Sequence, residues 1–272
     1  MKNGCELYNE DCNTTIGRLK DNSIDLVLTS PPYYNAKDYI QYDSVEDYMK
    51  QMEKIFVGIE RILKPSRMCV INVSPVLVPR KKRSKQSYRI PLPFYFVPIM
   101  EKIGYEFLED IIWKKPDGAS ANRNGGFFRH RKPVAYKPNI VTEYVLVFKK
   151  KANFLIDKVV KNHSLVEGEY ERTNVWEIQP ETKSWHEAPF PEKLAENIIR
   201  YYSYEEDIVY DPFAGSGTTG RVAKRLNRNC IMSEINKDFC ERILLDFSNK
   251  KEILKKILNT PIELGIKGTK LK

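Results

Sequence analysis

The chain has 272 residues, and 42% of them are hydrophobic, which is enough for one large α/β domain or two small ones. No stretch approaches the roughly 18 consecutive apolar residues of a membrane span, so we expect no membrane partner. The first residues lack the apolar segment of a secretory signal. The formal net charge of +9 favours a polyanionic partner wherever the basic residues cluster.

The cysteines and histidines argue against a disulfide framework or a zinc site. The five cysteines are scattered without a C-x-x-C pair, and the three histidines lack the spacing of metal ligands. We therefore expect no metal and a cytoplasmic location, where thiols stay reduced.

The first chemical feature is a rigid loop at the end of a predicted strand. A short apolar run over residues 24–28 predicts a buried strand. It runs into Ser30-Pro31-Pro32-Tyr33, whose prolines cannot donate to a sheet and fix the backbone. The loop therefore offers a hydroxyl, prolyl carbonyls and an aromatic face, which suit a planar ring bearing an amino group.

Helices and strands are predicted along the rest of the first half. Ser44 and the acidic residues after it indicate a helix start, and apolar residues then recur every three to four positions until Pro65. The other predicted elements are a strand at 6–8, a helix at 14–20, strands at 68–73, 109–113 and 141–148, and a helix at 92–103.

Two segments concentrate basic residues. Six of the eleven residues from 79 to 89 are basic and none is acidic, so we expect an exposed loop over 79–90 that contacts phosphates. Residues 114–140 interleave basic and aromatic side chains, as nucleic-acid-binding segments do. A merely solvated surface is the alternative. The candidate contacts are Arg80, Lys81, Lys82, Arg83, Lys85, Arg123, Arg129, Arg131 and Lys132.

The second chemical feature is a glycine loop between a strand and a helix. A strand at 207–211 is followed by Gly215, Gly217 and Gly220, which match G-x-G-x-x-G, and by a helix from about 218 to 226. The next strand, 229–233, ends at Glu234. Such a unit predicts a nucleoside-bearing cofactor whose ribose is held by the acid. A tight turn that binds nothing is the alternative.

The residues around the glycine loop favour S-adenosyl-L-methionine over a dinucleotide. Asp211 can lie near the ammonium group of this cofactor, and Phe213 can shield its reactive end. Aromatic faces suit a sulfonium cation. Nothing in the chain indicates a hydride-transfer site.

These two loops together resemble those of the DNA amino-methyltransferases. The resemblance rests on Ser30-Pro31-Pro32-Tyr33 and on residues 211–219, and it covers most of the chain. The order, with the catalytic loop first and the cofactor loop last, resembles the β group of this family. The supporting segments are Asp11, Leu63-Lys64-Pro65, residues 112–116, residues 186–191 and Glu234.

The resemblance implies a circularly permuted, doubly wound, mostly parallel α/β sheet of the S-adenosylmethionine-dependent methyltransferase (Rossmann-like) type. We expect one domain, with a catalytic part (1–114), a target-recognition insert outside the main sheet (about 115–184), a cofactor-binding part (about 185–258) and a peripheral tail (259–272). The implied cofactor residues are Asp11, Phe190, Asp211, Phe213, Gly215, Ser216, Gly217, Thr218 and Glu234.

The implied activity is methylation of an exocyclic amine of a base flipped out of double-stranded DNA. Ser30 and the Pro31 carbonyl would accept the amine N–H bonds, and Tyr33 would stack on the base. A serine at the first loop position resembles the N4-cytosine enzymes, so we prefer N4 of cytosine, with N6 of adenine as the alternative. A non-catalytic DNA-binding protein and a methylase of protein amides remain open. A homodimer and a cognate restriction endonuclease are the further partners implied.

Overall fold

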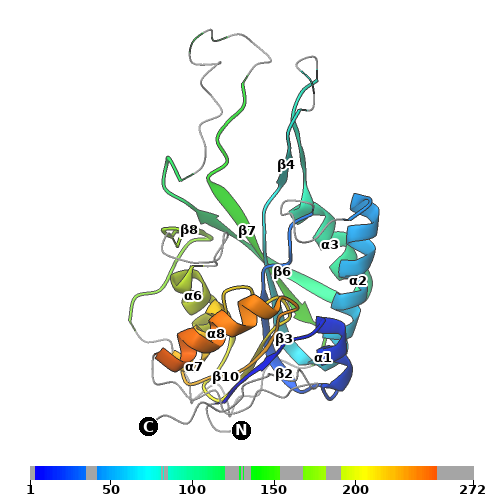
Figure 1. The fold of residues 1–272 in the computed structure, drawn as a ribbon, viewed down its shortest axis with the longest axis vertical. Helices are drawn as coiled ribbons and strands as arrows, with labels where there is room; N and C mark the ends of the chain where they lie inside the picture. The colour runs from blue at the N-terminus through cyan, green and yellow to red at the C-terminus, as the bar shows by residue number, and fades with distance from the viewer. Residues whose placement is uncertain are drawn as a thin grey trace, which may run out of the picture.

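The computed structural model describes residues 4–34, 42–80, 82, 85–119, 129, 131, 136–153, 168–181 and 191–249. Within these ranges the main sheet has eight strands, in the order β1-β10-β9-β2-β3-β7-β6-β8 (Figure 1). The strands are β1 (Cys5–Tyr8), β2 (Ile24–Thr29), β3 (Leu63–Val73), β6 (Tyr105–Lys114), β7 (Thr142–Lys150), β8 (Val175–Glu177), β9 (Ile208–Asp211) and β10 (Asn229–Ser233).

The strand directions make a mixed, mostly parallel sheet. The first five strands in that order run parallel, β7 runs antiparallel to both β3 and β6, and β8 is parallel to β6. Strands β2 and β9 are far apart in the sequence yet pair directly, with Leu26 opposite Val209. Their carboxyl ends, and therefore the loops that follow them, lie side by side.

Helices cover both faces of the sheet because side chains alternate along each strand. Val27 of β2 packs into one core, and its neighbours Leu26 and Leu28 pack into the other. The first core is closed by α1 (Cys12–Arg18), α2 (Val45–Ile62) and α3 (Leu92–Ile103); the second is closed by α6 (Glu192–Tyr202), α7 (Thr218–Arg225) and α8 (Lys237–Asn249). Figure 1 shows the two groups of helices on opposite sides of the sheet.

Helix α2 begins where its sequence predicts. Ser44 Oγ accepts a hydrogen bond of 3.0 Å from the backbone N–H of Asp47 and donates one of 2.8 Å to the Asp47 side chain. The cap satisfies a backbone donor that the first turn leaves without an intrahelical partner. The helix ends at Ile62, before Pro65.

The expectation that residues 115–184 lie outside the main sheet is wrong for β7 and β8. Strand β7 pairs with β3 on one side and with β6 on the other. Its segment Val145–Phe148 is buried on both faces, as the apolar run requires. The sequence hides this because a long polar stretch separates β7 from its partner β6.

A second, smaller sheet projects from the domain. Strands β4 (Val76–Val78) and β5 (Tyr88–Ile90) form an antiparallel hairpin. The loop predicted over 79–90 is therefore shorter, because its last three residues belong to β5. In Figure 1 this hairpin rises on the same side of the domain as the outer ends of β6 and β7. Lys137 Nζ lies 3.5 Å from Ser87 Oγ, so the two basic segments approach each other.

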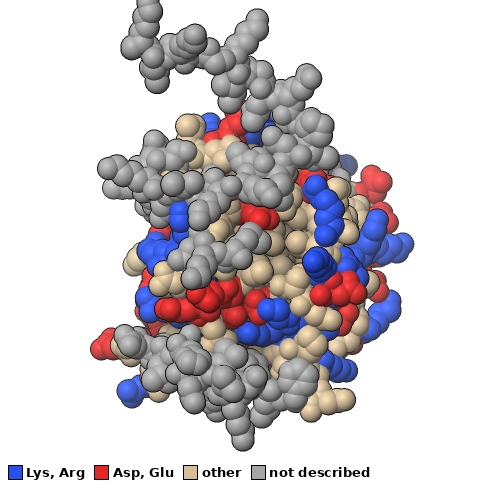
Figure 2. All heavy atoms as spheres, turned by 90° about the horizontal axis from the view of Figure 1, so that it is seen from below, with Lys and Arg blue, Asp and Glu red and all other residues tan. Residues whose placement is uncertain are grey.

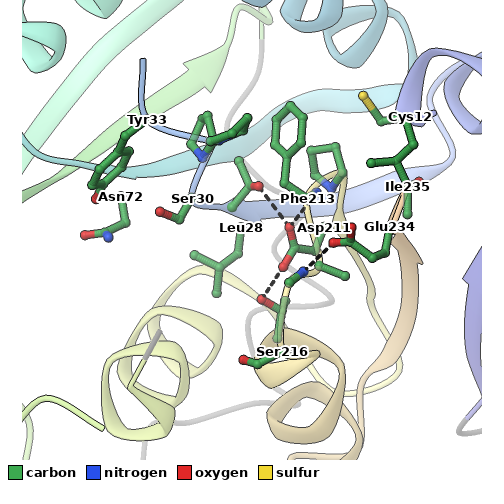
Figure 3. Close-up of a pocket in the computed structure, with 18 of the residues that line it drawn as sticks. Cys12, Leu28, Ser30, Tyr33, Asn72, Asp211, Phe213, Ser216, Glu234 and Ile235 are labelled. Atoms are coloured by element: carbon green, nitrogen blue, oxygen red, sulfur yellow. Dashed lines mark hydrogen bonds between the residues drawn. The ribbon is translucent and has the colours of Figure 1, made fainter. Parts of the chain in front are cut away.

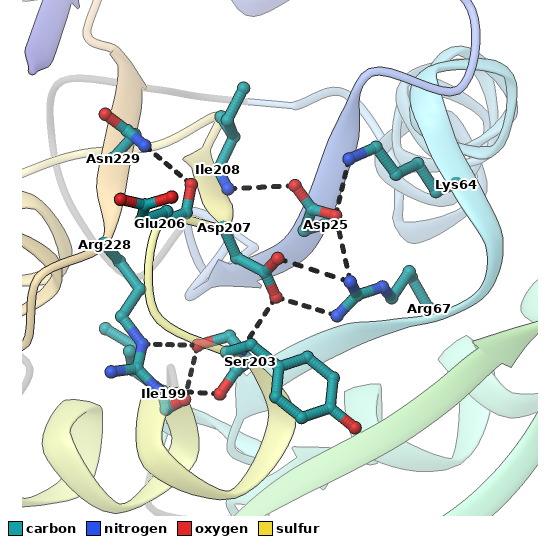
Figure 4. Close-up of polar contacts among 11 residues, drawn as sticks. Asp25, Lys64, Arg67, Ile199, Ser203, Glu206, Asp207, Ile208, Arg228 and Asn229 are labelled. Atoms are coloured by element: carbon teal, nitrogen blue, oxygen red, sulfur yellow. Dashed lines mark hydrogen bonds and ion pairs between the residues drawn. The ribbon is translucent and has the colours of Figure 1, made fainter. Parts of the chain in front are cut away.

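An ion-pair network joins three strands at the amino edge of the sheet (Figure 4). Arg67 of β3 bonds to Asp207, just before β9, at 2.8 Å and to Asp25 of β2 at 3.2 Å. Lys64 bonds to Asp25 at 2.7 Å. This network fastens β2, β3 and β9 together at the edge opposite the loops that follow these strands.

Charge is mixed on the face seen from below. In Figure 2 acidic and basic side chains are interspersed on that face, which carries no continuous basic patch on its described residues. Among the described residues, no helix is long and apolar enough to cross a membrane, and no cluster of His, Cys, Asp and Glu could hold a metal ion.

Candidate active site

A cavity of about 880 Å³ opens at the carboxyl ends of the central strands. The residues that line it come from the loops after four strands: Asp11 after β1, Ser30 after β2, Pro212 after β9 and Glu234 after β10. In open α/β sheets ligands bind at this edge, where loops from neighbouring strands converge. The two loops singled out in the sequence therefore face one cavity (Figure 3).

The Ser30-Pro31-Pro32-Tyr33 loop forms one wall of this cavity. The Tyr33 hydroxyl donates a 2.8 Å hydrogen bond to Glu143 Oε2. Burial raises the pKa of Tyr33 well above its ordinary value, and the charge of Glu143 adds to the rise, while a hydrogen bond with Ser30 opposes it. Tyr33 is therefore a neutral, anchored side chain, and its predicted stacking on a base stays a prediction.

Asp211 joins the two loops. Its Oδ1 accepts hydrogen bonds from Thr29 Oγ1 at 2.9 Å and from the Phe213 N–H at 3.1 Å, and its Oδ2 accepts one from Thr219 Oγ1 at 2.7 Å. Burial raises the pKa of the carboxyl, and these three donors counteract the rise. Thr29, which precedes the Ser30-Pro31-Pro32-Tyr33 loop, is thereby bonded to the strand that carries the glycine loop.

The glycine loop needs its glycines for two reasons. Gly215 and Gly217 have φ angles of +54° and +74°, which favour glycine. A Cβ atom on Gly217 would also lie 3.0 Å from the Ile243 side chain. The loop places Ser216 and Thr218 against the cavity at the start of α7.

Two further acids lie at the ends of β10 and β1. Glu234 accepts hydrogen bonds of 2.8 Å from the backbone N–H groups of Gly215 and Asn236. Burial raises its pKa, and these N–H groups work against the rise. Asp11 caps α1 by accepting a 2.8 Å bond from the Asn13 N–H. Both acids line the cavity, so each is placed to meet a ligand.

The residues at this end of the cavity fit a cationic nucleoside ligand. Among the described residues, neither Asp211 nor Glu234 forms an ion pair with a basic side chain. A carboxylate held away from water without a cation is costly. The sulfonium and ammonium groups of S-adenosyl-L-methionine would supply that cation, and the aromatic rings of Phe213 and Phe239 border the same space.

The sequence did not reveal a polar cluster at the other end of the cavity. Glu143 of β7 accepts hydrogen bonds from Tyr33, from Asn72 Nδ2 at 2.8 Å and from Lys115 Nζ at 2.5 Å. Figure 3 shows Tyr33, Asn72 and Ser30 grouped together, away from Glu234. One signal could have found Glu143, because a lone acid in an apolar strand needs buried partners.

The predicted DNA contacts are only partly described. Arg80, Lys82 and Lys85 lie in the β4–β5 loop and are exposed, as are Arg129 and Arg131. Their DNA contacts remain predictions. The other predicted residues lie outside the described part of the chain: Lys81, Arg83, Arg123, Lys132 and the predicted cofactor residue Phe190.

Comparisons with known proteins agree with this geometry. The family model for N6 and N4 methyltransferases, described as DNA methylase, matches residues 24–245. The chain is 30% identical over 264 residues to the type II beta methyltransferase M.BslI of Bacillus sp. (strain NEB-606), covering 93% of this chain and 28% of that protein. It is 31% identical over 248 residues to the type II methyltransferase M.BglII of Bacillus subtilis, covering 87% and 67%.

Solved structures share the fold. A DNA modification methylase homologue from Thermus thermophilus, complexed with S-adenosyl-L-methionine, matches with a TM-score of 0.74 and 26% identity over 90% of this chain and 93% of that one. The cytosine-N4-specific PvuII DNA methyltransferase matches in fold, with a TM-score of 0.69 and 22% identity over 90% and 86%. The predicted methyltransferase fold is confirmed, and the predicted cofactor is confirmed for the family.

Proposed function

This chain belongs to the DNA methylase family of N6 and N4 methyltransferases, and from that premise we propose that it methylates N4 of a flipped cytosine at a specific site in double-stranded DNA. The methyl donor is S-adenosyl-L-methionine. The observation that carries the proposal is the hydrogen bond between Thr29 and Asp211. It holds the Ser30 loop, which would bind the amine, beside the glycine loop, which would bind the cofactor, at one cavity.

The residues divide the cavity between two ligands. Asp211 and Glu234 would hold the ammonium and ribose of the cofactor, and Gly215, which lines the cavity, would allow it to approach the backbone. When bound, the cofactor supplies an electrophilic methyl group on a cationic sulfur. Phe213 borders the space between the two loops, where an aromatic face stabilises that cation.

The Ser30 loop prepares the amine. An exocyclic amine is a weak nucleophile because its lone pair is delocalised into the ring. Ser30 Oγ and the Pro31 carbonyl accept its two N–H bonds, which favours a pyramidal nitrogen with a freer lone pair. Holding the amine at one position also removes much of the entropic cost of bringing two reactants together. Tyr33 packs against the base.

The DNA is held by the basic segments on the side of the domain where the hairpin rises. Arg80, Lys82 and Lys85 are exposed near the tip of the β4–β5 hairpin, so their charges can neutralise phosphates. A type II restriction–modification setting, with a partner endonuclease for the same site and a homodimeric enzyme, is part of this proposal.

The proposal is tested with tritiated S-adenosyl-L-methionine and duplex DNA. We expect tritium in the DNA, and we expect Ser30→Ala to lower kcat at least 100-fold, about 3 kcal/mol, with little change in cofactor affinity. Ser23→Ala is the matched control, because Ser23 precedes the opposite end of β2 and its hydroxyl bonds only to the Lys20 carbonyl among the described residues. An unchanged kcat in Ser30→Ala would contradict the role of Ser30, and no label in any DNA would contradict the activity.

A further inference from the structure

We propose that Lys115 reads the Watson–Crick edge of the flipped base, donating hydrogen bonds to the ring nitrogen beside the exocyclic amine and to O2 of cytosine. This inference rests on the proposed function, because it assigns a specificity-determining residue to the same cavity. Lys115 follows β6 and lines the cavity that Ser30 also lines.

The Lys115 side chain is held by two contacts to its ammonium group, and its backbone is held by a third. Its Nζ lies 2.5 Å from Glu143 Oε1 and 4.6 Å from the centre of the Trp113 ring. Trp113 is itself fixed, with only 4% of its surface exposed and its indole N–H bonded to the Ile178 carbonyl at 2.8 Å. The Lys115 backbone N–H bonds to the Val141 carbonyl at 2.6 Å. A lysine so constrained loses little further entropy when it binds a ligand.

The ammonium has donors left for a ligand. It carries three N–H bonds, and among the described residues Glu143 is its one hydrogen-bond acceptor. Asn72 is 3% exposed, and its Oδ1 has no hydrogen-bond partner within the described structure. Buried polar atoms are rarely left unpaired. A ligand with hydrogen-bond acceptors would satisfy the remaining Lys115 donors, and the unpaired Asn72 Oδ1 shows that the described residues do not supply every polar partner at this end of the cavity.

The charge balance of the cluster suits a neutral ligand. Glu143 is 9% exposed and offsets the Lys115 charge, whereas Asp211 and Glu234 at the opposite end of the cavity lack a basic partner among the described residues. The amine nitrogen gains positive charge as it is methylated, so an uncompensated lysine beside it would slow the reaction. Paired with Glu143, Lys115 can donate hydrogen bonds without that penalty.

The donor pattern distinguishes the two candidate bases. Cytosine presents a donor at N4 and acceptors at N3 and O2, whereas adenine presents a donor at N6, an acceptor at N1 and a carbon–hydrogen group at C2. Ser30 and Pro31 supply acceptors for the amine, and Lys115 supplies the two remaining donors that cytosine needs. With adenine one Lys115 N–H would stay unpaired in a partly buried site, which is unfavourable.

The test compares Lys115→Met with wild type on two duplexes, once the methylated site has been mapped. One duplex carries cytosine at the target position, and the other carries 3-deazacytosine, which keeps the amine and O2 but replaces N3 by a carbon. We expect wild type to prefer cytosine by about 10- to 100-fold in kcat/KM, the size of one charged hydrogen bond. Lys115→Met should lose most of that preference. The altered basicity of the analogue's amine affects both proteins equally and cancels.

Lys114→Met is the matched control. Lys114 is the preceding residue, and its ammonium bonds to exposed Glu177 at 2.6 Å, outside the cavity lining. It should keep the wild-type preference. If Lys115→Met does not turn over, the same preference is read from competition binding of the two duplexes. An unchanged preference in Lys115→Met, or N6-methyladenine as the product of the wild type, overturns the inference. Absence of any methyl transfer by the wild type would instead contradict the proposed function.

Discussion

Replacing Asp211 by asparagine should separate the folding role of this residue from its binding role. Asp211 is 4% exposed, and its two oxygens accept three hydrogen bonds from protein donors. Asparagine keeps the shape. Its Oδ1 can accept from Thr29 and from the Phe213 N–H, and its Nδ2 can donate to Thr219, whose hydroxyl can rotate and accept.

The expected effect on stability is therefore small. Burial raises the pKa of Asp211, which means that the buried charge is unfavourable in the free protein, and the amide removes it. We expect the free energy of unfolding to change by no more than about 1 kcal/mol, a shift of about 2–4 °C in Tm. Asp211→Ala should be worse, because it leaves three buried donors unpaired.

The expected effect on the cofactor is large. If Asp211 holds the ammonium group, losing its charge removes a charged interaction of about 1.5–3 kcal/mol, so the Kd for S-adenosyl-L-methionine rises roughly 10- to 150-fold. Calorimetric titration measures this, and adenosine is the control ligand because it lacks the cationic end and should bind both proteins equally. A Kd within about twofold of wild type, in a variant that melts normally, would refute the assigned role.

Two further substitutions test the ion-pair network and the glycine loop. Arg67→Met leaves Asp25 and Asp207 without their shared partner and should lower the free energy of unfolding by about 3 kcal/mol in urea titrations. Cofactor affinity should stay unchanged, because the network lies at the edge of the sheet opposite the cavity. An unaltered unfolding midpoint would count against this reasoning. Gly217→Ala places a side chain at φ +74°, which costs about 1–2 kcal/mol, and should weaken cofactor binding. Gly17→Ala, within α1 and with open space around it, should be neutral or stabilising in the same melts, and equal effects of the two would contradict the strain argument.

The parts of the site that the sequence predicted are those encoded by contiguous residues. Ser30-Pro31-Pro32-Tyr33 and the glycine loop each show their chemistry locally, since prolines stop a strand and glycines permit a tight turn. Strands β2 and β9 pair in parallel, so the two loops that follow them lie at the same edge of the sheet.

The polar cluster could not be predicted in the same way, because sheet pairing assembles it from separate strands. Asn72 and Glu143 are 71 positions apart and come together because β3 and β7 are adjacent. Lys115 is one of many basic residues in its segment, and nothing local marks it as the one that meets Glu143. The misassignment of β7 to an insert concealed this contact.

The most direct test of the central claim is the identity of the methylated nucleoside. Duplex DNA is incubated with the protein and labelled S-adenosyl-L-methionine, digested to nucleosides and separated by chromatography with mass detection. We predict that the label appears in N4-methylcytosine. Label confined to N6-methyladenine would contradict the choice of base, and label in neither nucleoside would contradict DNA amine methylation itself.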